Sequence, residues 1–587
     1  MAKSAAERVQ AYLTRKRQRA REAGLCITCC KEPPRNGRST CGSCSQSASH
    51  RTMKRRIALR HRAKFQQVIE AREEAGDIAQ QHHFHSGAIL HYRGALALAT
   101  MAHDRTRISG KIAHTLYLGS TPTDGRHLLD DTLSQYTASQ MQGVKVAELL
   151  IERARQLWTE HRMKDALPDL RRAIEIAKAA GDLPLYKSAN LTMISYLFNL
   201  NRWDEIRSFF EAIGEMHKSE DGEIRNNFFT QRALMATVQG RAKDAYADLE
   251  QAIQIDIDQA DTERASRTWM VWGNYGWAAL ALGDTLLAKS HLERGLLIVR
   301  QKQITWSIPY KCLVYADILR KMGHYSIAHH YVREALSYET PATAVQFAAA
   351  EVGIPLALEV KDDEALGKCA SPHLIEQAFA SCLPFDIGPI AAAFARLYFS
   401  QGKLKEASTL LHRALEKVLN FEQSWDLFLE IARYGTLEDI PKARAIIEKR
   451  TALPCSNVAH ACLKLFNAFV AHRSHRTSEA YVSAREAARC FGALHWNAYV
   501  DIAHSLLPEA ERQASTVVKQ ETLVSDIGMR LTQREHEIVA LVLKGLTNRA
   551  IAEQLSLKER TIESHMTSIM SRLGIRSRYQ LGTMLPD

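Results

Sequence analysis

Apolar residues recur at helical spacing along most of the chain, from about residue 80 to about residue 505, and few segments alternate as strands do. One unit is repeated in this region: an apolar helix, a Gly or polar residue, and a second helix with two small residues seven positions apart. Small residues at that spacing lie on one helix face and let paired helices approach closely. The clearest copies are marked by Gly240, Gly283, Gly323 and Gly402, and weaker copies by Arg162, Asn201, Asp362, Asp439 and Ser474.

The copies from Arg162 to Gly323 are 39 to 43 residues apart. A fixed period of this size is typical of stacked helix pairs that bury their apolar faces against neighbouring pairs. The pattern therefore predicts an all-α fold with an α-solenoid over residues 80–508. It resembles a tetratricopeptide-type array with longer helices, which implies a concave surface that binds a protein or peptide and leaves small-molecule sensing open. The tryptophans of this region are expected to be packing residues rather than a ligand cage, including Trp269, Trp272 and Trp277.

The C-terminal end, residues 527–587, carries a different pattern of short helices. The second of them spans Asn548 to Leu555, a turn-length gap follows, and the third spans Arg560 to Leu573. Two helices joined by such a turn form a helix-turn-helix, which lays its second helix in the major groove of DNA. The expected inward positions are Ile538, Leu541, Val542, Ile551, Ala552, Leu555, Ile562, Met566, Ile569 and Leu573.

These positions belong to a longer motif that resembles the LuxR-type (GerE-type) helix-turn-helix of bacterial response regulators and quorum-sensing activators. The matching residues are Leu531, Thr532, Arg534, Glu535, Gly545, Thr547, Asn548, Ile551, Ala552, Leu555, Thr561, Ile562, His565, Ile569, Leu573, Gly574, Ile575, Ser577 and Arg578. The resemblance implies a four-helix domain whose third helix reads double-stranded DNA, with a homodimer expected on two half-sites. By that likeness the DNA-binding residues are Arg549, Arg560, Thr561 and Arg578 near phosphates, Glu563, Ser564 and Thr567 at base edges, and His565 in the same motif.

Two features of this domain argue against strong DNA binding. Glu563 and Thr567 stand where the family usually has basic or apolar readers, although a carboxylate can accept a hydrogen bond from cytosine N4. Residues 526–587 hold nine Lys and Arg against seven Asp and Glu, whereas neutralisation of phosphates supplies much of DNA affinity. A helical-repeat scaffold with a relic terminal domain is therefore an alternative.

Positive charge is concentrated at the N-terminal end. Residues 1–64 hold seventeen Lys and Arg against three Glu, and the whole chain has a net charge of +12. The same segment contains two CxxC pairs separated by eleven residues, which place four thiolates where a tetrahedral ion could lie. Zn²⁺ is the ion that such a set favours, with Cys30 and His50 as further candidates. The expected ligands are Cys26, Cys29, Cys41 and Cys44.

Residues 1–65 thus resemble a zinc-ribbon module flanked by basic helices. DNA, RNA and an acidic protein surface all satisfy its charge, so an RNA-binding regulator driven by this module is a second alternative. Residues 509–526, rich in small and polar side chains, read as a linker. Four histidines near the start of the array lack Cys or acidic partners at matching spacing and are interpreted as helix residues rather than metal ligands: His82, His83, His85 and His91.

Several classes of protein are disfavoured. The chain has no GxxxxGK[ST], GxSxG, HExxH or GxGxxG motif, which argues against an enzyme. We expect no membrane span and no secretory signal, because apolar runs are short and the first residues are basic and polar. Five of the eleven cysteines crowd between residues 26 and 44, which favours a reducing cytoplasm over a disulfide framework. The sequence predicts a cytoplasmic, nucleoid-associated bacterial transcription regulator.

Overall fold

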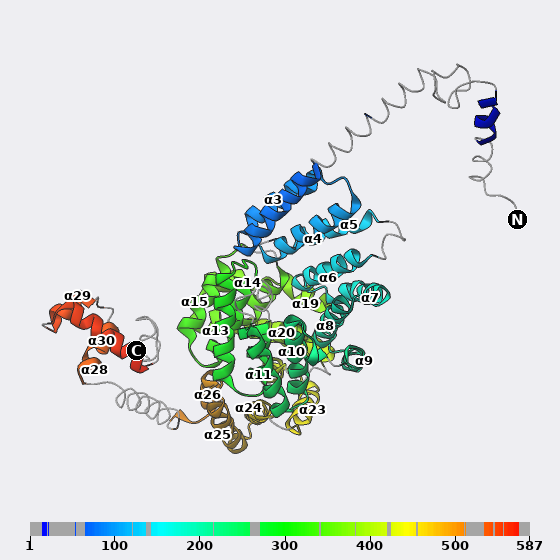
Figure 1. Ribbon diagram of the computed structural model, residues 1–587. Coiled ribbons are helices and arrows are strands. Elements are labelled where there is room, and N and C mark those ends of the chain that lie inside the picture. The colour runs from blue at the N-terminus through cyan, green and yellow to red at the C-terminus, as the bar shows by residue number, and fades with distance from the viewer. Residues whose placement is uncertain are drawn as a thin grey trace. The chain divides into compact units, whose positions relative to one another are not determined.

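The structure, a computed structural model, contains only helices as regular elements in the residues that it describes (Figure 1). These residues are 14–19, 21–22, 53, 65–119, 121–136, 143–214, 216–258, 271–339, 342–381, 383–418, 424–453, 456–509, 511, 533–543, 546, 548–555 and 557–573.

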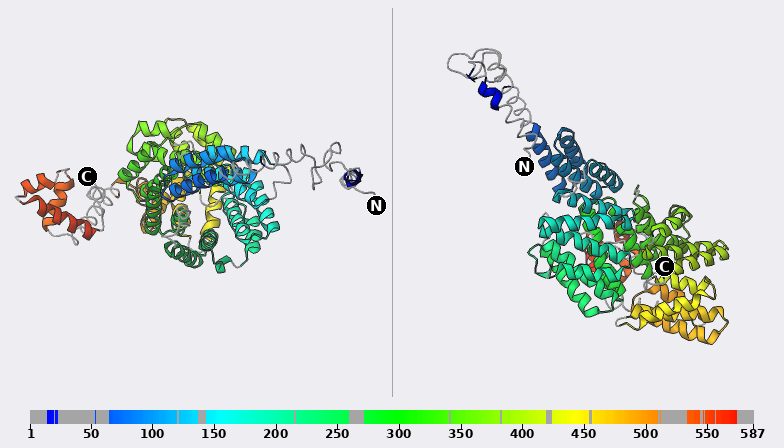
Figure 2. Two further views of the ribbon diagram at one scale, coloured as in Figure 1. Left: turned by 45° about the horizontal axis from the view of Figure 1, so that its top comes forward. Right: turned by 90° about the vertical axis from the view of Figure 1, so that its right-hand side faces the viewer.

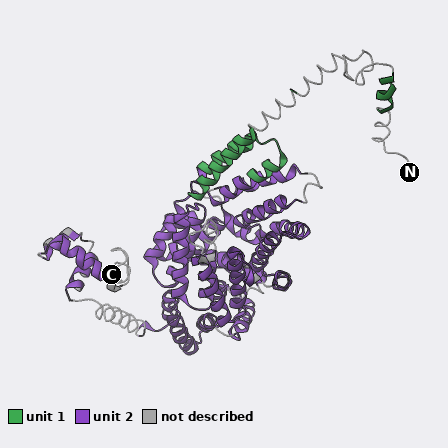
Figure 3. Cartoon of the chain, in the orientation of Figure 1, with its two compact units in different colours: residues 1–82, 87–108 green, residues 83–86, 109–587 purple. Residues whose placement is uncertain are grey.

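The chain forms two compact units (Figure 3). The first comprises residues 1–82 and 87–108, and within it a helix over residues 65–81 packs against α3 (His85–Leu98) and the start of α4 (Ala102–Leu118). The buried Tyr92 of α3 donates its hydroxyl to Asp77 at 2.6 Å. Arg107 of α4 donates from two nitrogens to the carboxylate of Glu73, at 2.9 and 2.8 Å. These cross-helix bonds fix the register of the three helices.

The second unit, residues 83–86 and 109–587, contains the helical array, whose successive pairs run from cyan to orange in Figure 2. After α4 the array consists of α5 (Pro122–Ser134), α6 (Val144–Thr159), α7 (Met163–Ala180), α8 (Leu183–Asn199), α9 (Trp203–Ile213), η2 (Met216–Lys218), α10 (Gly222–Val238), α11 (Ala242–Asp258), α12 (Val271–Ala281), α13 (Thr285–Gln301), α14 (Ser307–Lys321), α15 (Tyr325–Leu336), α16 (Thr343–Ala348), η4 (Ala349–Gly353), α17 (Ile354–Val360), α18 (Asp363–Cys369), α19 (His373–Ser381), α20 (Pro384–Ser400), α21 (Leu404–Val418), α22 (Trp425–Tyr434), α23 (Asp439–Thr451), α24 (Asn457–Arg473), α25 (Thr477–Ala493) and α26 (Asn497–His504).

The predicted repeat is confirmed at the turns between paired helices. Gly240, Gly283, Gly323 and Gly402 have left-handed φ values of 71°, 88°, 83° and 75°. At each turn the next amide reaches back to a carbonyl of the preceding helix, as Asp284 N does to Ala279 O at 2.9 Å. This is the Schellman arrangement, for which Gly is favoured because it has no Cβ. The small residues seven apart are buried between the paired helices, as expected: Ala245 and Ala252, Ala288 and Gly295, Ala328 and Ala335, and Ala407 and Ala414.

Four of the five weaker copies have the same turn without glycine, whereas the copy at Asp439 has no left-handed residue among those described. Asn201 is left-handed with φ of 58°, and Lys361 and His475, one position from Asp362 and Ser474, have φ of 57° and 56°. In the copy predicted at Arg162, the left-handed residue is instead His161, one position earlier, with φ of 55°. A residue with a side chain is tolerated there because the two backbone bonds of the turn compensate for its strain.

Contacts between distant repeats close the array on itself. His161, in the turn after α6, lies 2.6 Å from Asp386 of α20 through Nδ1 and Oδ2. Arg450 of α23 donates to main-chain carbonyls at the end of α10. Thr285, at the start of α13, donates to the carbonyl of Leu494 after α25. The early and late helix pairs therefore enclose a common interior.

One stretch of the described residues, Thr343–Val360, is long and apolar enough to cross a membrane by length and composition, contrary to the expectation that no apolar run reaches this size. It corresponds to α16, η4 and α17 taken together, and 61% of it is buried inside the protein. Such burial is typical of a core helix.

Candidate DNA-binding surface and interior cavity

Three C-terminal helices pack around a small core of their own: α28 (Gln533–Leu543), α29 (Asn548–Gln554) and α30 (Glu559–Leu573). The bounds of α29 and α30 agree with those of the predicted helices to within one residue. Every predicted inward position whose side chain is described is buried or partly buried in this core, so the apolar pattern was read correctly. The core residues are Ile538, Val539, Leu541, Val542, Ile551, Ala552, Ile562, Met566 and Ile569, with Leu546, Leu555 and Leu557 packed against them.

Hydrogen bonds end α29, begin α30 and join the end of α29 to α28. Leu557 N donates to Ala552 O at 2.8 Å, which ends α29, and Thr561 N donates to Lys558 O at 2.9 Å, which begins α30. Arg534 of α28 donates to the carbonyl of Leu555 at 3.0 Å. A cation on a terminal carbonyl of α29 is favourable because that end carries partial negative charge.

The N-terminal half of α30 presents a polar face. Arg560, Glu563, Ser564 and Thr567 are exposed, as base- or phosphate-contacting residues must be, while Ile562 and Met566 of the same helix are buried. The predicted residues Thr561 and His565 are half-buried at the edge of this face. We call the exposed set the α30 face: Arg560, Glu563, Ser564 and Thr567.

Thr567 of the α30 face already makes one hydrogen bond within its own helix. The Thr567 hydroxyl donates to the main-chain carbonyl of Glu563 at 2.9 Å. Since a hydroxyl has one hydrogen, Thr567 can accept from a base but cannot also donate to one while this bond is made. Two of the predicted contacts are not located. The side chain of Arg549 and the whole of Arg578 lie outside the described residues, as do the linker beyond residue 511 and the cysteines Cys26, Cys29, Cys41 and Cys44.

Residues 529–585 match the family model described as bacterial regulatory proteins, luxR family. This stretch is a LuxR-type helix-turn-helix domain. The match is supported by Oxygen regulatory protein NreC of Staphylococcus aureus, for instance in strains JH9 and Mu3, which is 45% identical over 51 residues. That alignment covers 9% of this chain and 24% of the relative, so the chain matches about a quarter of the length of these curated relatives.

Two solved structures are similar to a large part of this chain. Yeast Tom70 is 14% identical, with a TM-score of 0.27, over 75% of this chain and 96% of that one. The human IFIT1 dimer with m7Gppp-AAAA is 14% identical, with a TM-score of 0.33, over 68% of this chain and 90% of that one. Scores this low do not decide the fold, which follows from the tetratricopeptide-like helix pairs themselves.

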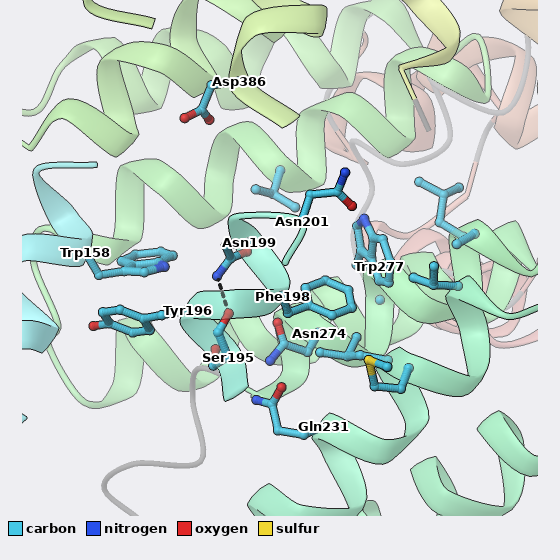
Figure 4. A pocket seen from close by; sticks show the side chains of 18 of the residues that line it. Trp158, Ser195, Tyr196, Phe198, Asn199, Asn201, Gln231, Asn274, Trp277 and Asp386 are labelled. Carbon is cyan, nitrogen blue, oxygen red and sulfur yellow. Dashed lines mark hydrogen bonds between the residues drawn. The ribbon is translucent and has the colours of Figure 1, made fainter. Parts of the chain in front are cut away.

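The interior of the array contains a large cavity of about 1440 Å³ (Figure 4). Its lining comes mainly from the first helix of successive pairs, from α6 to α14, and from α9, η4, α20 and α22. Trp272 is a core residue as predicted, 7% exposed and edge-on to Tyr275. Trp277 packs edge-on against Phe198 with ring centroids 5.7 Å apart, but it also lines the cavity. Trp269 lies outside the described residues.

A buried network of charges borders this cavity between α14, α20 and α22. Asp317 pairs with Lys321 and, at 2.9 Å, with Arg320. Arg320 and Arg396 both reach Asp426, at 3.7 and 3.2 Å. Burial opposes ionisation of the two aspartates, yet the adjacent cations hold the pKa of each below its usual range. The network therefore stays ionised and joins helices that are far apart in sequence.

Glu351 lies beside this network on η4, a π-helical turn. Burial, and then the negative charge of Asp317, raise the pKa of Glu351 to about 8. A carboxyl group in this state is largely protonated at neutral pH and can donate a hydrogen bond into the cavity that it lines.

The residues of the cavity were not predicted from the sequence. Lys311, for example, lies on α14 among Tyr310, Cys312, Leu313 and Val314. A lysine within so apolar a stretch of helix is a signal that could have been used, because a surface helix usually keeps its cations on a polar face.

Proposed function

We propose that this protein is a DNA-binding transcription regulator whose LuxR-type domain reads double-stranded DNA and whose helical array binds a signal-bearing protein or peptide. The α30 face carries the proposal. A buried side made of Ile562, Met566 and Ile569 fixes α30 on its own small core, which leaves Arg560, Glu563, Ser564 and Thr567 free to approach DNA. A rigid helix with this division of faces is what insertion into a major groove requires.

We propose that different residues of α30 contact the phosphates and the bases. Arg560 and Thr561 at the start of α30 are suited to phosphates, because the amino end of a helix carries partial positive charge. Glu563, Ser564 and Thr567 are suited to base edges, where a carboxylate selects cytosine N4. Two half-sites are needed for specific binding by such a small unit, so we expect a homodimer on DNA.

The test compares binding of the full-length chain to its operator with binding of variants. Arg560→Ala combined with Thr561→Ala is expected to weaken binding and to lower the slope of log affinity against log salt by about one. Glu563→Lys is expected to bind DNA more tightly and with changed base preference. Glu416→Lys, an exposed reversal of charge on α21, is the control and should change neither.

Unchanged affinity and salt slope in the Arg560 and Thr561 variant would contradict the assignment of α30. An unaltered Glu563→Lys variant would favour a scaffold with a relic terminal domain. Strong competition by RNA that depends on residues 1–65 would favour the RNA-binding alternative.

We further propose that Cys26, Cys29, Cys41 and Cys44 hold one structural Zn²⁺ ion. Their two CxxC pairs and the basic residues around them support this assignment. The ion would fold a basic module that adds nonspecific contacts to a polyanion. That contribution matters because the LuxR-type domain has little net positive charge of its own.

A further inference from the structure

The interior cavity contains a buried cation without a counter-charge. Lys311 of α14 is 5% exposed and lines the cavity. In the part of the chain that the structure describes, its ammonium group has no hydrogen-bond or ion-pair partner, and burial alone lowers the pKa of Lys311 to about 8. At neutral pH it is therefore a charged group held away from water, which is costly unless an anion compensates it.

Other cations of the cavity differ from Lys311 in this respect. Arg155 pairs with Glu152 at 3.1 Å, and Lys321 pairs with Asp317. Among the described residues, no carboxylate that lines the cavity forms an ion pair with Lys311. The missing negative charge must come from outside the described chain if Lys311 is to be paired.

The backbone beside Lys311 leaves room for its ammonium group. A Cβ atom at Gly273 of α12 would collide with Lys311 Nζ, so the amine lies directly over the surface of α12 at this glycine. Trp277 lies four residues further along, one turn away on the same face of α12. Its ring packs edge-on against that of Phe198, and the two rings form an apolar wall of the cavity.

Gln231, a second polar residue of the cavity lining, also has an atom that could accept a further hydrogen bond. Gln231 of α10 is 3% exposed, and its Oε1 atom is buried without a hydrogen-bond partner in the described structure. Its Nε2 atom donates to Asn227 at 3.4 Å. Figure 4 shows Gln231 with Asn274, Phe198 and Trp277 among the side chains that line the cavity. The lining thus combines a buried cation that has no partner among the described residues, one unsatisfied amide oxygen and aromatic walls, and such a mixture is usual in a small-molecule site.

We propose that the cavity binds a small organic carboxylate, whose carboxylate group pairs with Lys311 and whose apolar body packs against Trp277 and Phe198. One ammonium group balances one negative charge, which favours a carboxylate over a phosphate or other dianion. This site goes beyond the proposed DNA reading, and its occupancy can be measured without DNA.

The experiment measures binding of two probes to the full-length chain at neutral pH by quenching of tryptophan fluorescence. The probes are 1-naphthaleneacetate and 1-naphthaleneacetamide, which have the same apolar body and differ in charge. We expect the carboxylate to bind at least about tenfold more tightly than the amide, as for a buried charged pair. Lys311→Met should abolish this ratio while leaving the affinity for the amide unchanged.

Lys289→Met, on the neighbouring α13 and only weakly paired with Glu293 at 4.0 Å, is the control and should keep the ratio. Circular dichroism checks that each variant is folded. If Lys311→Met does not fold, Gly273→Ala is the second variant, because its methyl group displaces the ammonium and should lower the ratio.

Equal affinities for the two probes in the wild type, or no saturable quenching by the carboxylate up to about 5 mM, would overturn the proposal. So would a ratio that persists in Lys311→Met. None of these results would alter the effect of Arg560→Ala and Thr561→Ala on operator binding, so failure of this site and failure of the DNA-binding proposal are distinguishable.

Discussion

His161 and Asp386 are 225 residues apart in sequence, yet His161 Nδ1 lies 2.6 Å from Asp386 Oδ2. Each side chain is 7% exposed. His161 is also the left-handed residue that ends the turn after α6, so one position both joins two helices of a pair and contacts a distant pair. The ring of Phe347 packs edge-on against it, with centroids 4.9 Å apart. This contact encloses the interior cavity by linking the early repeats to α20.

The contact between His161 and Asp386 is expected to stabilise the array. Asp386→Ala would leave His161 buried without its carboxylate partner and should reduce the free energy of unfolding by about 2–4 kcal/mol. Urea unfolding followed by circular dichroism measures this. Glu376→Ala removes an exposed pair with Arg413 and serves as the control, with an expected loss below about 1 kcal/mol. Equal losses in the two variants would contradict a closing role for Asp386.

Because Lys311 is buried, we expect the free energy of unfolding to rise with pH in the alkaline range. Burial lowers the pKa of Lys311 from 10.5 to about 8, so between these values the unfolded chain holds a proton that the folded chain releases. Lys311→Met should therefore stabilise the ligand-free protein at neutral pH by about 2–4 kcal/mol. The gain should shrink as pH rises from about 8 to about 10.5. Unfolding midpoints across this range test it, and destabilisation by Lys311→Met at neutral pH would show that the amine is already compensated.

Because Glu351 is buried, we expect the free energy of unfolding to fall as pH rises at lower pH, which is the opposite of the effect of Lys311. Burial first, and then Asp317, raise the pKa of Glu351 from 4.5 to about 8. Its contribution to stability is full below about pH 4.5 and is lost as pH rises through about 8. Glu351→Gln should match the wild type at about pH 5 and exceed it at about pH 9. Glu359→Gln, an exposed change on α17, is the control. A constant difference between Glu351→Gln and the wild type at both pH values would contradict the assignment.

Metal analysis tests the N-terminal module. The full-length protein, purified without chelator, should contain about one Zn²⁺ per chain. Replacing Cys26 and Cys41 by Ser should remove this metal, whereas Cys490→Ser, at a half-buried cysteine of α25, should not. A metal-free wild type, or a Cys26 and Cys41 variant that retains zinc, would contradict a tetrahedral site formed by the two CxxC pairs.

The sequence predicted the local structure of the array more fully than its closure. Gly283 and Gly323 are recognisable because a left-handed turn between helices favours glycine. His161 in the same conformation carries no such mark, which explains the error of one position at the copy assigned to Arg162. Closure depends on small rotations added over many helix pairs, so the meeting of His161 with Asp386 cannot be read from any one repeat.

The same limit applies to the two candidate sites. The exposure of the α30 face agrees with the sequence, because it follows from helical periodicity and from a motif whose residues are contiguous in sequence. Lys311 was not predicted, since its burial depends on Gly273 of another helix and on the enclosure of the cavity. Sequence patterns identify sites built on one element more readily than sites assembled from several.

The most direct test of DNA reading is genome-wide occupancy of the tagged full-length protein in its host, compared with the Arg560→Ala and Thr561→Ala variant and with a chain lacking residues 527–587. We expect sharp peaks that share an inverted repeat, are weakened by the double substitution and vanish on truncation. Diffuse occupancy that truncation leaves unchanged would contradict a sequence-specific regulator and would attribute nucleic-acid binding to the basic N-terminal module.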